Sequence, residues 1–209
     1  MPASPFPLSM SHKTDMALSF LYTKLFEVAF SSRDSHVHHS CRFYGYQNLS
    51  IGNRFRARRG LWLEAVSLYF GQSFNPKLLI SDDFSVSENT HIACCSMLTI
   101  GRSVLVGSCV LITDHNHGDY SSLSSNASSP LEPPMYRALS CNPVVIGDNV
   151  FIGDGARILP GSTIDNGAII AANSVVMGHV PRNTIVAGSP ARPVKVYDSK
   201  TLTWLRVVS

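Results

Sequence analysis

Two histidines and an acidic residue lie together in one short segment, Asp114-His115-Asn116-His117. A hydroxyl group is a weak nucleophile near neutral pH, and a neutral imidazole beside it takes its proton as a general base. A carboxylate next to the imidazole commonly orients the ring. The segment therefore predicts a histidine base, either His115 or His117, with Asp114 as the candidate orienting group.

The elements that must position this segment show a repeat of six residues. Aliphatic side chains recur at Ile146, Ile152, Ile158, Ile164, Ile170 and Val176. Small or β-branched residues follow four positions later at Val150, Ala156, Ser162, Ala168 and Ser174. Neither an α-helix nor a simple strand has a period of six, so the spacing predicts a repeat architecture. If three hexads close one triangular coil, the aliphatic side chains stack inside it.

The histidine segment lies where this repeat is interrupted. Earlier hexads run through Ile80, Val86 and Ile92, slip by two residues, and resume at Ile100, Val106 and Ile112. The repeat is then suspended until Ile146 by a stretch rich in serine and proline. Loops of this length in a compact domain are usually functional or disordered. We therefore expect the loop at residues 113–143 to carry the chemistry.

The hexad pattern, aliphatic then glycine with a small residue three positions later, resembles that of the left-handed β-helix acyltransferases. This resemblance implies an all-β fold, a left-handed parallel β-helix with a short N-terminal helical cap and an extended catalytic loop. The segments 114–120 and 132–134 most resemble the O-acetyltransferases of lipopolysaccharide and capsule biosynthesis. The similarity covers roughly residues 51–209.

The loop is also similar to that of the maltose and galactoside O-acetyltransferases, whose base lies seventeen residues after the Ile-Gly pair that opens the preceding coil. From Ile100 this count gives His117, with His115 as the alternative because an irregular corner shifts such a count by two residues. The resemblance also implies Tyr120 and Phe151 as acceptor contacts. Phe151 stands where the family usually has tryptophan, so an aromatic wall is kept.

The resemblance further implies acetyl-coenzyme A as co-substrate, with no metal required. Two segments resemble the coenzyme A-binding coils of the family, residues 171–176 and 187–192. They carry over Gly153 and Ala172 for the pantetheine arm, and Arg192 and Lys195 for the nucleotide end. The Thr-Lys pair common in the family is Met177-Gly178 here, which leaves more of the phosphate binding to Arg192.

Composition limits the class of protein. The 209 residues are 44% hydrophobic and carry a net charge of +3, enough for one buried domain and too little charge to suggest nucleic acid. Five cysteines without a CxxC pair argue against a disulfide framework or a zinc knuckle and favour a reducing cytosol. We expect Cys109 in the interior as a small hydrophobe. The apolar run at 16–22 is too short to span a bilayer, so a cytoplasmic location without a transmembrane segment is predicted.

Three regions are expected: a helical cap at 1–40, the β-helix domain at 41–196, and a C-terminal tail at 197–209. The cap should contain a helix from about Thr14 to Phe30, capped by Thr14 or Asp15. Its packing face is expected to comprise Leu18, Leu21, Leu25 and Phe26.

Together these features predict a homotrimer that transfers an acetyl group directly from acetyl-coenzyme A to a hydroxyl of a sugar or polysaccharide precursor. Two other functions are considered. A β-helix zinc carbonic anhydrase would use His91, His115 and His117 as its three ligands. A non-catalytic β-helix scaffold is disfavoured, because it has no need of a histidine-bearing loop that interrupts the repeat.

Overall fold

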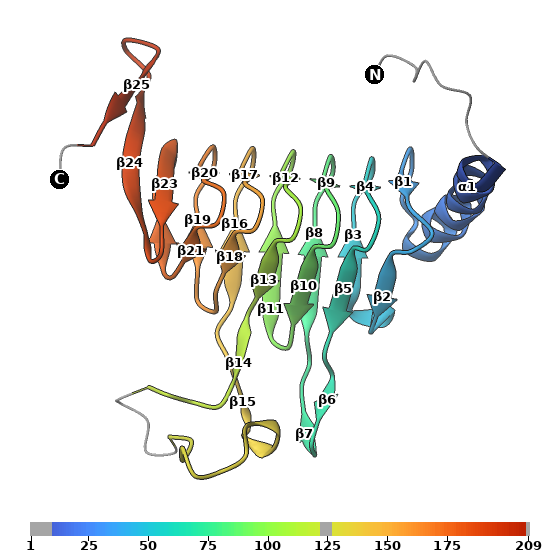
Figure 1. Cartoon of the computed structure of the whole chain (residues 1–209), viewed down its shortest axis with the longest axis horizontal. Coiled ribbons are helices and arrows are strands. Elements are labelled where there is room, and N and C mark those ends of the chain that lie inside the picture. The colour runs from blue at the N-terminus through green and yellow to red at the C-terminus, as the bar shows by residue number, and fades with distance from the viewer. Residues whose placement is uncertain (1–9, 122–126, 208–209) are drawn as a thin grey trace.

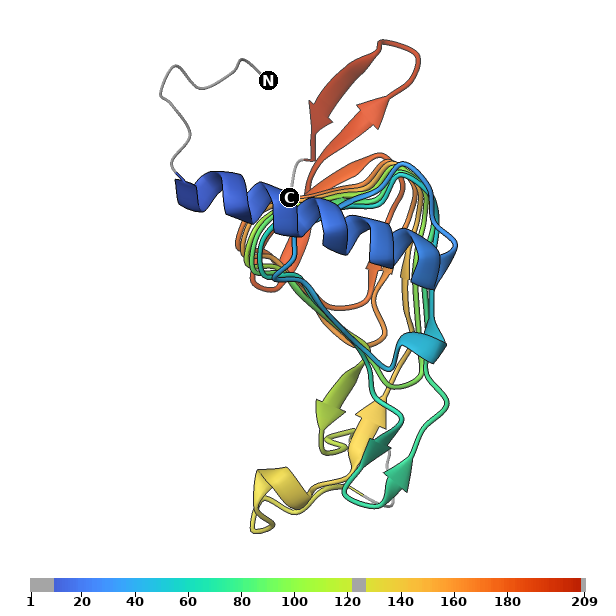
Figure 2. The same cartoon turned by 90° about the vertical axis from the view of Figure 1, so that its right-hand side faces the viewer.

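The computed structural model describes residues 10–121 and 127–207. Its core is a three-sided prism in which each coil of the chain adds one short strand to each of three sheets (Figures 1 and 2). The pairings inside the prism are parallel, as between Ile80 of one coil and Ile100 of the next. The predicted left-handed parallel β-helix of hexapeptide repeats is confirmed.

Each side of the prism is one of these sheets. The first sheet contains, in order, β1 (His36–Val37), β4 (Arg56–Ala57), β9 (Ser85–Val86), β12 (Leu105–Val106), β17 (Phe151–Ile152), β20 (Ile169–Ile170), β23 (Thr184–Gly188), β24 (Ala191–Asp198) and β25 (Thr203–Arg206). The second contains β2 (Arg42–Tyr44), β5 (Trp62–Ala65), β10 (His91–Cys94), β13 (Leu111–Thr113), β18 (Arg157–Ile158) and β21 (Val175–Val176). The third contains β3 (Leu49–Ile51), β8 (Lys77–Ile80), β11 (Met97–Ile100), β16 (Val144–Ile146), β19 (Thr163–Ile164) and β22 (His179–Val180).

The six-spaced aliphatic residues fill the inside of the prism. Along the second sheet, for example, Ile92, Ile112 and Ile158 stack in register, and all three are fully buried. The small residues four positions later are also buried, including Ala156 and Ser162. A solenoid therefore buries its apolar surface coil against coil, and each missing methylene group would leave a void between two coils.

Cys109 is exposed, contrary to the expectation that it fills the interior. It occupies a corner of the coil with a φ of 58°, in the left-handed region. Asn149 and Asn173 occupy corners with the same backbone conformation. A residue at such a corner directs its side chain away from the core, which the hexad count alone does not reveal.

Helix α1 (Met10–Phe30) lies across the N-terminal end of the prism (Figure 2). The cap is present, but the helix starts before Thr14, and three of the four predicted packing residues are exposed, namely Leu18, Leu21 and Leu25. Phe26 is buried as expected, and its ring lies 5.2 Å from that of Phe55. Aromatic rings and Thr23 close the open end of the prism instead of the leucines, because apolar residues occur around the whole helix and periodicity could not single out one face.

No helix in the described part of the chain is both long and apolar enough to cross a membrane. At the other end, β23, β24 and β25 pair antiparallel and form a projecting ribbon (Figure 1). Strand β24 runs through the expected start of the tail at residue 197, so the tail continues the first sheet. Residues 1–9 of the expected cap and 208–209 of the expected tail lie outside the described residues.

Two arms leave the prism on the same side (Figures 1 and 2). One is the predicted loop, whose ends form the antiparallel pair β14 (His115–His117) and β15 (Leu139–Cys141). The other is a hairpin of β6 (Leu68–Tyr69) and β7 (Gln72–Ser73), which the sequence did not predict. Short 3₁₀ helices lie at Tyr46–Asn48 and, within the loop, at Pro134–Tyr136.

Candidate active site

A buried carboxylate and a histidine form the centre of the loop arm. Asp114 is fully buried at the end of β13, and its Oδ1 lies 3.0 Å from Nδ1 of His115. Since a carboxylate only accepts hydrogen bonds, Nδ1 carries the proton and Nε2 of His115 keeps a free lone pair. The His115 side chain is 12% exposed, so it remains accessible at its edge. This is the arrangement of a general base with its orienting group.

The charge on Asp114 is held by donors from the preceding coil. The backbone N–H groups of Cys95 and Ser96 donate to its two oxygens, both at 2.8 Å. The Cys94 thiol lies 3.4 Å from Oδ2. Burial, together with Asp114, raises the pKa of Cys94 to about 12, which keeps it as a protonated donor. Burial alone would raise the pKa of Asp114, but hydrogen bonds from His115 and these groups outweigh it and lower that pKa.

His115 and His117 occupy different environments although both belong to β14. His115 packs against the coil beside Asp114, whereas His117 is exposed and has no carboxylate among its recorded contacts in the described residues. The His117 ring lies edge-on to Tyr69 at 5.2 Å, and its carbonyl oxygen accepts the Tyr120 hydroxyl proton at 2.6 Å. The geometry therefore favours His115 as the base and gives His117 a place in the wall of the loop.

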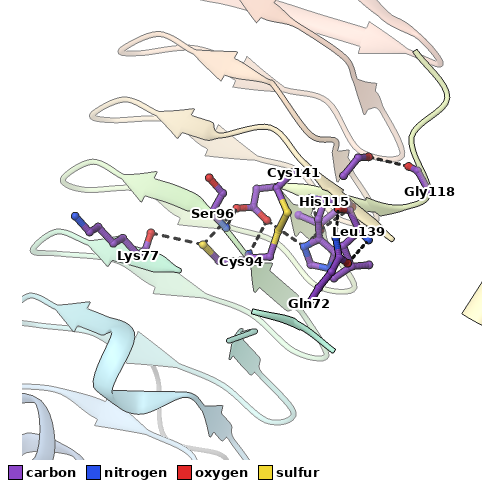
Figure 3. Close-up of a disulfide and its surroundings, with 12 residues drawn as sticks. Gln72, Lys77, Cys94, Ser96, His115, Gly118, Leu139 and Cys141 are labelled. Atoms are coloured by element: carbon purple, nitrogen blue, oxygen red, sulfur yellow. Dashed lines mark hydrogen bonds and ion pairs between the residues drawn. A yellow bond between two sulfur atoms is a disulfide. The ribbon is translucent and has the colours of Figure 1, made fainter. Parts of the chain in front are cut away.

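A disulfide joins this arm to the coil, although the number and spacing of the cysteines argued against a disulfide framework. Cys95 is bonded to Cys141, and Cys141 pairs with His115 across the β14–β15 ladder (Figure 3). The two cysteines are 46 residues apart, with the whole excursion of the loop between them. No short spacing motif marks such a pair, so counting cysteines could not find it. The bond fixes the strand that pairs with His115 to the turn whose backbone N–H groups hold Asp114.

The β6–β7 hairpin supports the loop from the neighbouring coil. Gln72 accepts the Leu139 backbone N–H at 2.7 Å, and its amide donates to the Leu139 carbonyl at 3.5 Å. The side chain of Gln72 thus pairs with β15 as another strand would (Figure 3). The Tyr69 hydroxyl donates to the carbonyl of Met135 at 2.7 Å. These contacts hold the outer part of the loop beside His115.

The two expected acceptor contacts lie in different places. Tyr120 is exposed within the loop, where its hydroxyl accepts a hydrogen bond from Arg137 at 2.8 Å. Phe151 points outward from β17, on the first sheet, in register with Leu105 and Ile169. The structure therefore brings Tyr120 beside His117 and leaves Phe151 on another face of the same prism.

The residues expected to bind coenzyme A form two pairs. Gly153 and Ala172 stack at one corner on adjacent coils, so closely that a Cβ atom on Gly153 would lie 2.6 Å from the Ala172 nitrogen. Only glycine fits this approach. Arg192 and Lys195 both lie on β24, with Arg192 exposed. The four residues follow the C-terminal half of the prism, beyond the coil that carries Asp114.

The three histidines of the carbonic anhydrase alternative do not form a metal-binding group among the described residues. His91 stacks on Trp62 with ring centroids 4.2 Å apart, and its Nε2 lies 3.5 Å from Glu64. Burial lowers the pKa of His91. Its environment is that of an aromatic stack on the second sheet.

Several residues that build the site were missed from the sequence. The amides of Cys95 and Ser96 come from the point where the hexad register slips by two residues, so the slip itself was the available signal. Gln72 lies in a second, shorter gap in the repeat, between Val66 and Lys77. Each departure from the period of six therefore marks a part of the site.

Known proteins resemble this chain in sequence. Residues 143–178 match the family model described as bacterial transferase hexapeptide (six repeats). The chain is 41% identical over 157 residues to WbbJ of Escherichia coli, described as a lipopolysaccharide biosynthesis O-acetyl transferase, covering 75% of this chain and 76% of that protein. It is 31% identical over 139 residues to the galactoside O-acetyltransferase of Escherichia coli, covering 66% and 62% of the two chains.

A solved structure has the same fold. The N-acyltransferase AntD from Bacillus cereus, in complex with dTDP and 3-hydroxybutyryl-CoA, superposes with a TM-score of 0.68 at 20% identity, covering 86% of this chain and 90% of that one. The six-residue repeat and the 41% identity to WbbJ indicate the same family. The chain therefore belongs to the hexapeptide-repeat family of bacterial transferases and is an O-acetyltransferase of that family.

Proposed function

We propose that the protein transfers an acetyl group from acetyl-coenzyme A to a hydroxyl of a sugar or polysaccharide precursor, with His115 as general base. The observation that carries this proposal is the Asp114–His115 pair, with Nδ1 fixed as donor and Nε2 free. The identity to WbbJ supports a bacterial surface-polysaccharide precursor as the acceptor class.

The reaction needs one proton to move twice. Nε2 of His115 takes the proton of the acceptor hydroxyl while its oxygen attacks the thioester carbonyl carbon. The C–S bond then breaks, and the coenzyme A thiolate receives the proton from Nε2. Three other donors keep the Asp114 carboxylate charged. Its negative charge stabilises the imidazolium that forms on His115 between the two proton transfers. No acyl-enzyme is required, so the cysteines serve as structure.

Acetyl-coenzyme A is assigned to the C-terminal coils. The Gly153–Ala172 corner has no side chain larger than a methyl group, so an extended pantetheine arm could approach its backbone groups. Arg192 and Lys195 supply positive charge on β24 for the phosphates, and the guanidinium of Arg192 is exposed there. Tyr120 and Phe151 would then contact the acceptor from the loop and from the first sheet.

A homotrimer is part of the proposal. Apolar side chains point outward in two columns, Leu105 and Phe151 on the first sheet and Leu79 and Val145 on the third, each about 40–50% exposed. Two flat apolar faces per chain are what a closed ring of prisms requires. The cytoplasmic location stays a prediction, and the Cys95–Cys141 disulfide removes the cysteine argument that favoured it.

The test measures release of the coenzyme A thiol from acetyl-coenzyme A with a panel of free oligosaccharides, nucleotide sugars and lipid-linked repeat units. We expect His115→Ala to lose about 10²- to 10⁴-fold in turnover, the usual contribution of a general base. His117→Ala should retain turnover within about tenfold, and both variants should still bind coenzyme A by calorimetry. Full activity in His115→Ala, with loss in His117→Ala, would move the base to His117.

A further inference from the structure

A second group of chemically reactive side chains lies at the opposite end of the prism from the C-terminal ribbon, between α1 and the first coil. Asp15 of α1 faces His38 and His39, which directly follow β1. Its Oδ1 lies 2.8 Å from Nε2 of His39, and its Oδ2 lies 3.2 Å from Nε2 of His38. All three ligand atoms lie within 4.8 Å of one another.

These separations match the edges of a metal coordination sphere. Zinc binds histidine nitrogen and carboxylate oxygen at about 2.0–2.2 Å, so the edges of its tetrahedron are about 3.3–3.6 Å long. The two observed contacts are within about 0.5 Å of that length. Two histidines and one carboxylate form a donor set that suits zinc and leaves one position open. Hence little movement is needed to admit an ion.

The two histidines are also oriented towards the carboxylate. Their rings stack with centroids 4.5 Å apart, and both present Nε2 to Asp15. Imidazole nitrogen and carboxylate oxygen are among the ligands that bind zinc.

Ser40 can hold His38 in the tautomer that metal binding needs. Without metal, the Ser40 backbone N–H donates to Nδ1 of His38 at 3.1 Å, which leaves the ring proton on Nε2 facing Asp15. With metal on Nε2, the ring proton must lie on Nδ1, and the Ser40 hydroxyl oxygen 2.8 Å away can accept it once the Ser40 N–H turns away from that nitrogen. That oxygen is itself fixed by the Gly60 N–H at 2.9 Å. Ligating histidines commonly have such an outer partner.

The group borders a cavity of about 500 Å³ that also has His12 and Glu88 in its lining. His12 lies about one helical turn before Asp15, on the same side of α1. The guanidinium of Arg59 is the competing cation, 3.4 Å from Oδ2 of Asp15, and its side chain is 60% exposed. An incoming metal ion would displace the exposed Arg59 guanidinium towards solvent.

We propose that Asp15, His38 and His39 form a zinc site that fastens helix α1 to the first coil, separate from acetyl transfer. The ligands come from two elements that also meet through hydrogen bonds, because Ser19 Oγ accepts the His39 backbone N–H at 3.3 Å and the Thr23 hydroxyl donates to the Val37 carbonyl at 3.1 Å. Binding would therefore add a metal link between the first half of α1 and the prism. Because only the folded state assembles the three ligands, zinc should stabilise the protein by mass action.

The test uses full-length protein stripped with a chelator and titrated with Zn²⁺ by calorimetry and by thermal unfolding. We expect one ion per chain and a higher Tm with zinc. His39→Ala should weaken binding at least tenfold and abolish the Tm increase. The matched control is His179→Ala, which removes an exposed histidine paired with Asp165 at 3.0 Å and should change neither value.

A variant that is expected to strengthen zinc binding separates the proposal from a folding defect, which would only weaken binding. Arg59→Ala removes the competing cation and should tighten zinc binding several-fold. The absence of stoichiometric binding, or equal affinity in wild type and His39→Ala, would overturn the proposal. Binding that persists in His39→Ala and disappears in His115→Ala would place the ion at the catalytic pair and would also overturn it.

Discussion

Replacing Asp114 by asparagine tests the catalytic geometry with the smallest change in shape. Asp114 receives hydrogen bonds from the amides of Cys95 and Ser96 and from Nδ1 of His115, at 2.8, 2.8 and 3.0 Å. Asparagine offers one accepting oxygen and one donating NH₂ group. If the NH₂ group faces His115, the ring must accept there and carry its proton on Nε2. The base is then in the wrong tautomer.

The size of the effect follows from that tautomer. Loss of the orienting carboxylate in Ser-His-Asp hydrolases costs about 10⁴-fold in turnover for the same reason. If the NH₂ group instead turns towards Ser96, the tautomer is kept and one buried amide loses its acceptor, at about 1–3 kcal/mol of stability. We therefore expect Asp114→Asn to reduce turnover by about 10²- to 10⁴-fold and to lower the free energy of unfolding by about 1–3 kcal/mol.

The assay is release of the coenzyme A thiol at saturating acetyl-coenzyme A, with urea denaturation of the same preparations. Asp165→Asn is the matched control, because Asp165 also pairs with a histidine, His179, but at an exposed position. That control should keep full activity. The reasoning is refuted if Asp114→Asn turns over at the wild-type rate while the protein remains folded.

The pH dependence of the free energy of unfolding tests the charge on Asp114 independently of activity. The pKa of Asp114 lies below its ordinary value of 3.8 in the folded protein. A carboxylate with a lowered folded-state pKa contributes stability that is complete above its unfolded pKa and is lost as the pH falls through the folded one. The stability difference between wild type and Asp114→Asn should therefore be constant above about pH 5 and shrink below about pH 4. A difference that does not change with acid would contradict the assignment.

Three further predictions concern the scaffold around the base. Cys141→Ser opens the disulfide to Cys95. Because the two cysteines are 46 positions apart, the chain-entropy model gives a loss of about 4 kcal/mol in the free energy of unfolding, and a reducing agent should destabilise wild type but not the variant in urea denaturation. Gln72→Leu removes both hydrogen bonds to Leu139, so we expect the KM for the acceptor to rise with little change in Tm; an unchanged KM would show that the hairpin does not position the loop. Ile158→Ala leaves a cavity between fully buried coils and should cost about 2–5 kcal/mol in denaturation experiments, and a loss below about 1 kcal/mol would contradict the tight coil packing.

Much of the fold could be predicted because a solenoid is held together by local repetition. Each hexad specifies its own strand and corner, so Ile146 and Ile152 indicate their burial without reference to distant residues. The helix was also predicted, but its packing face was not. Several sides of α1 are apolar, and the choice of Phe26 over Leu21 and Leu25 depends on the shape of the prism end that receives it.

The candidate active site was only partly predictable, for a related reason. The sequence predicted the chemistry in the loop and named Asp114, His115 and His117, with His117 first by counting along the chain. The direction in which β14 leaves the prism decides which histidine contacts the Asp114 carboxylate. That direction is set by antiparallel pairing with β15, which comes from the other end of the loop. The disulfide partners, Cys95 and Cys141, were hidden by the same 46-residue separation.

By itself, then, the sequence determined the period, the interior of the prism, the family and the place where the repeat opens. Only the tertiary structure decided which groups meet at that opening: two backbone amides from the preceding coil on Asp114, Gln72 on β15, and His115 at the free edge. The physical reason is that stacking of coils is a contact between neighbouring repeats, whereas the site is made where the repeat fails, by segments that the coils bring together from afar.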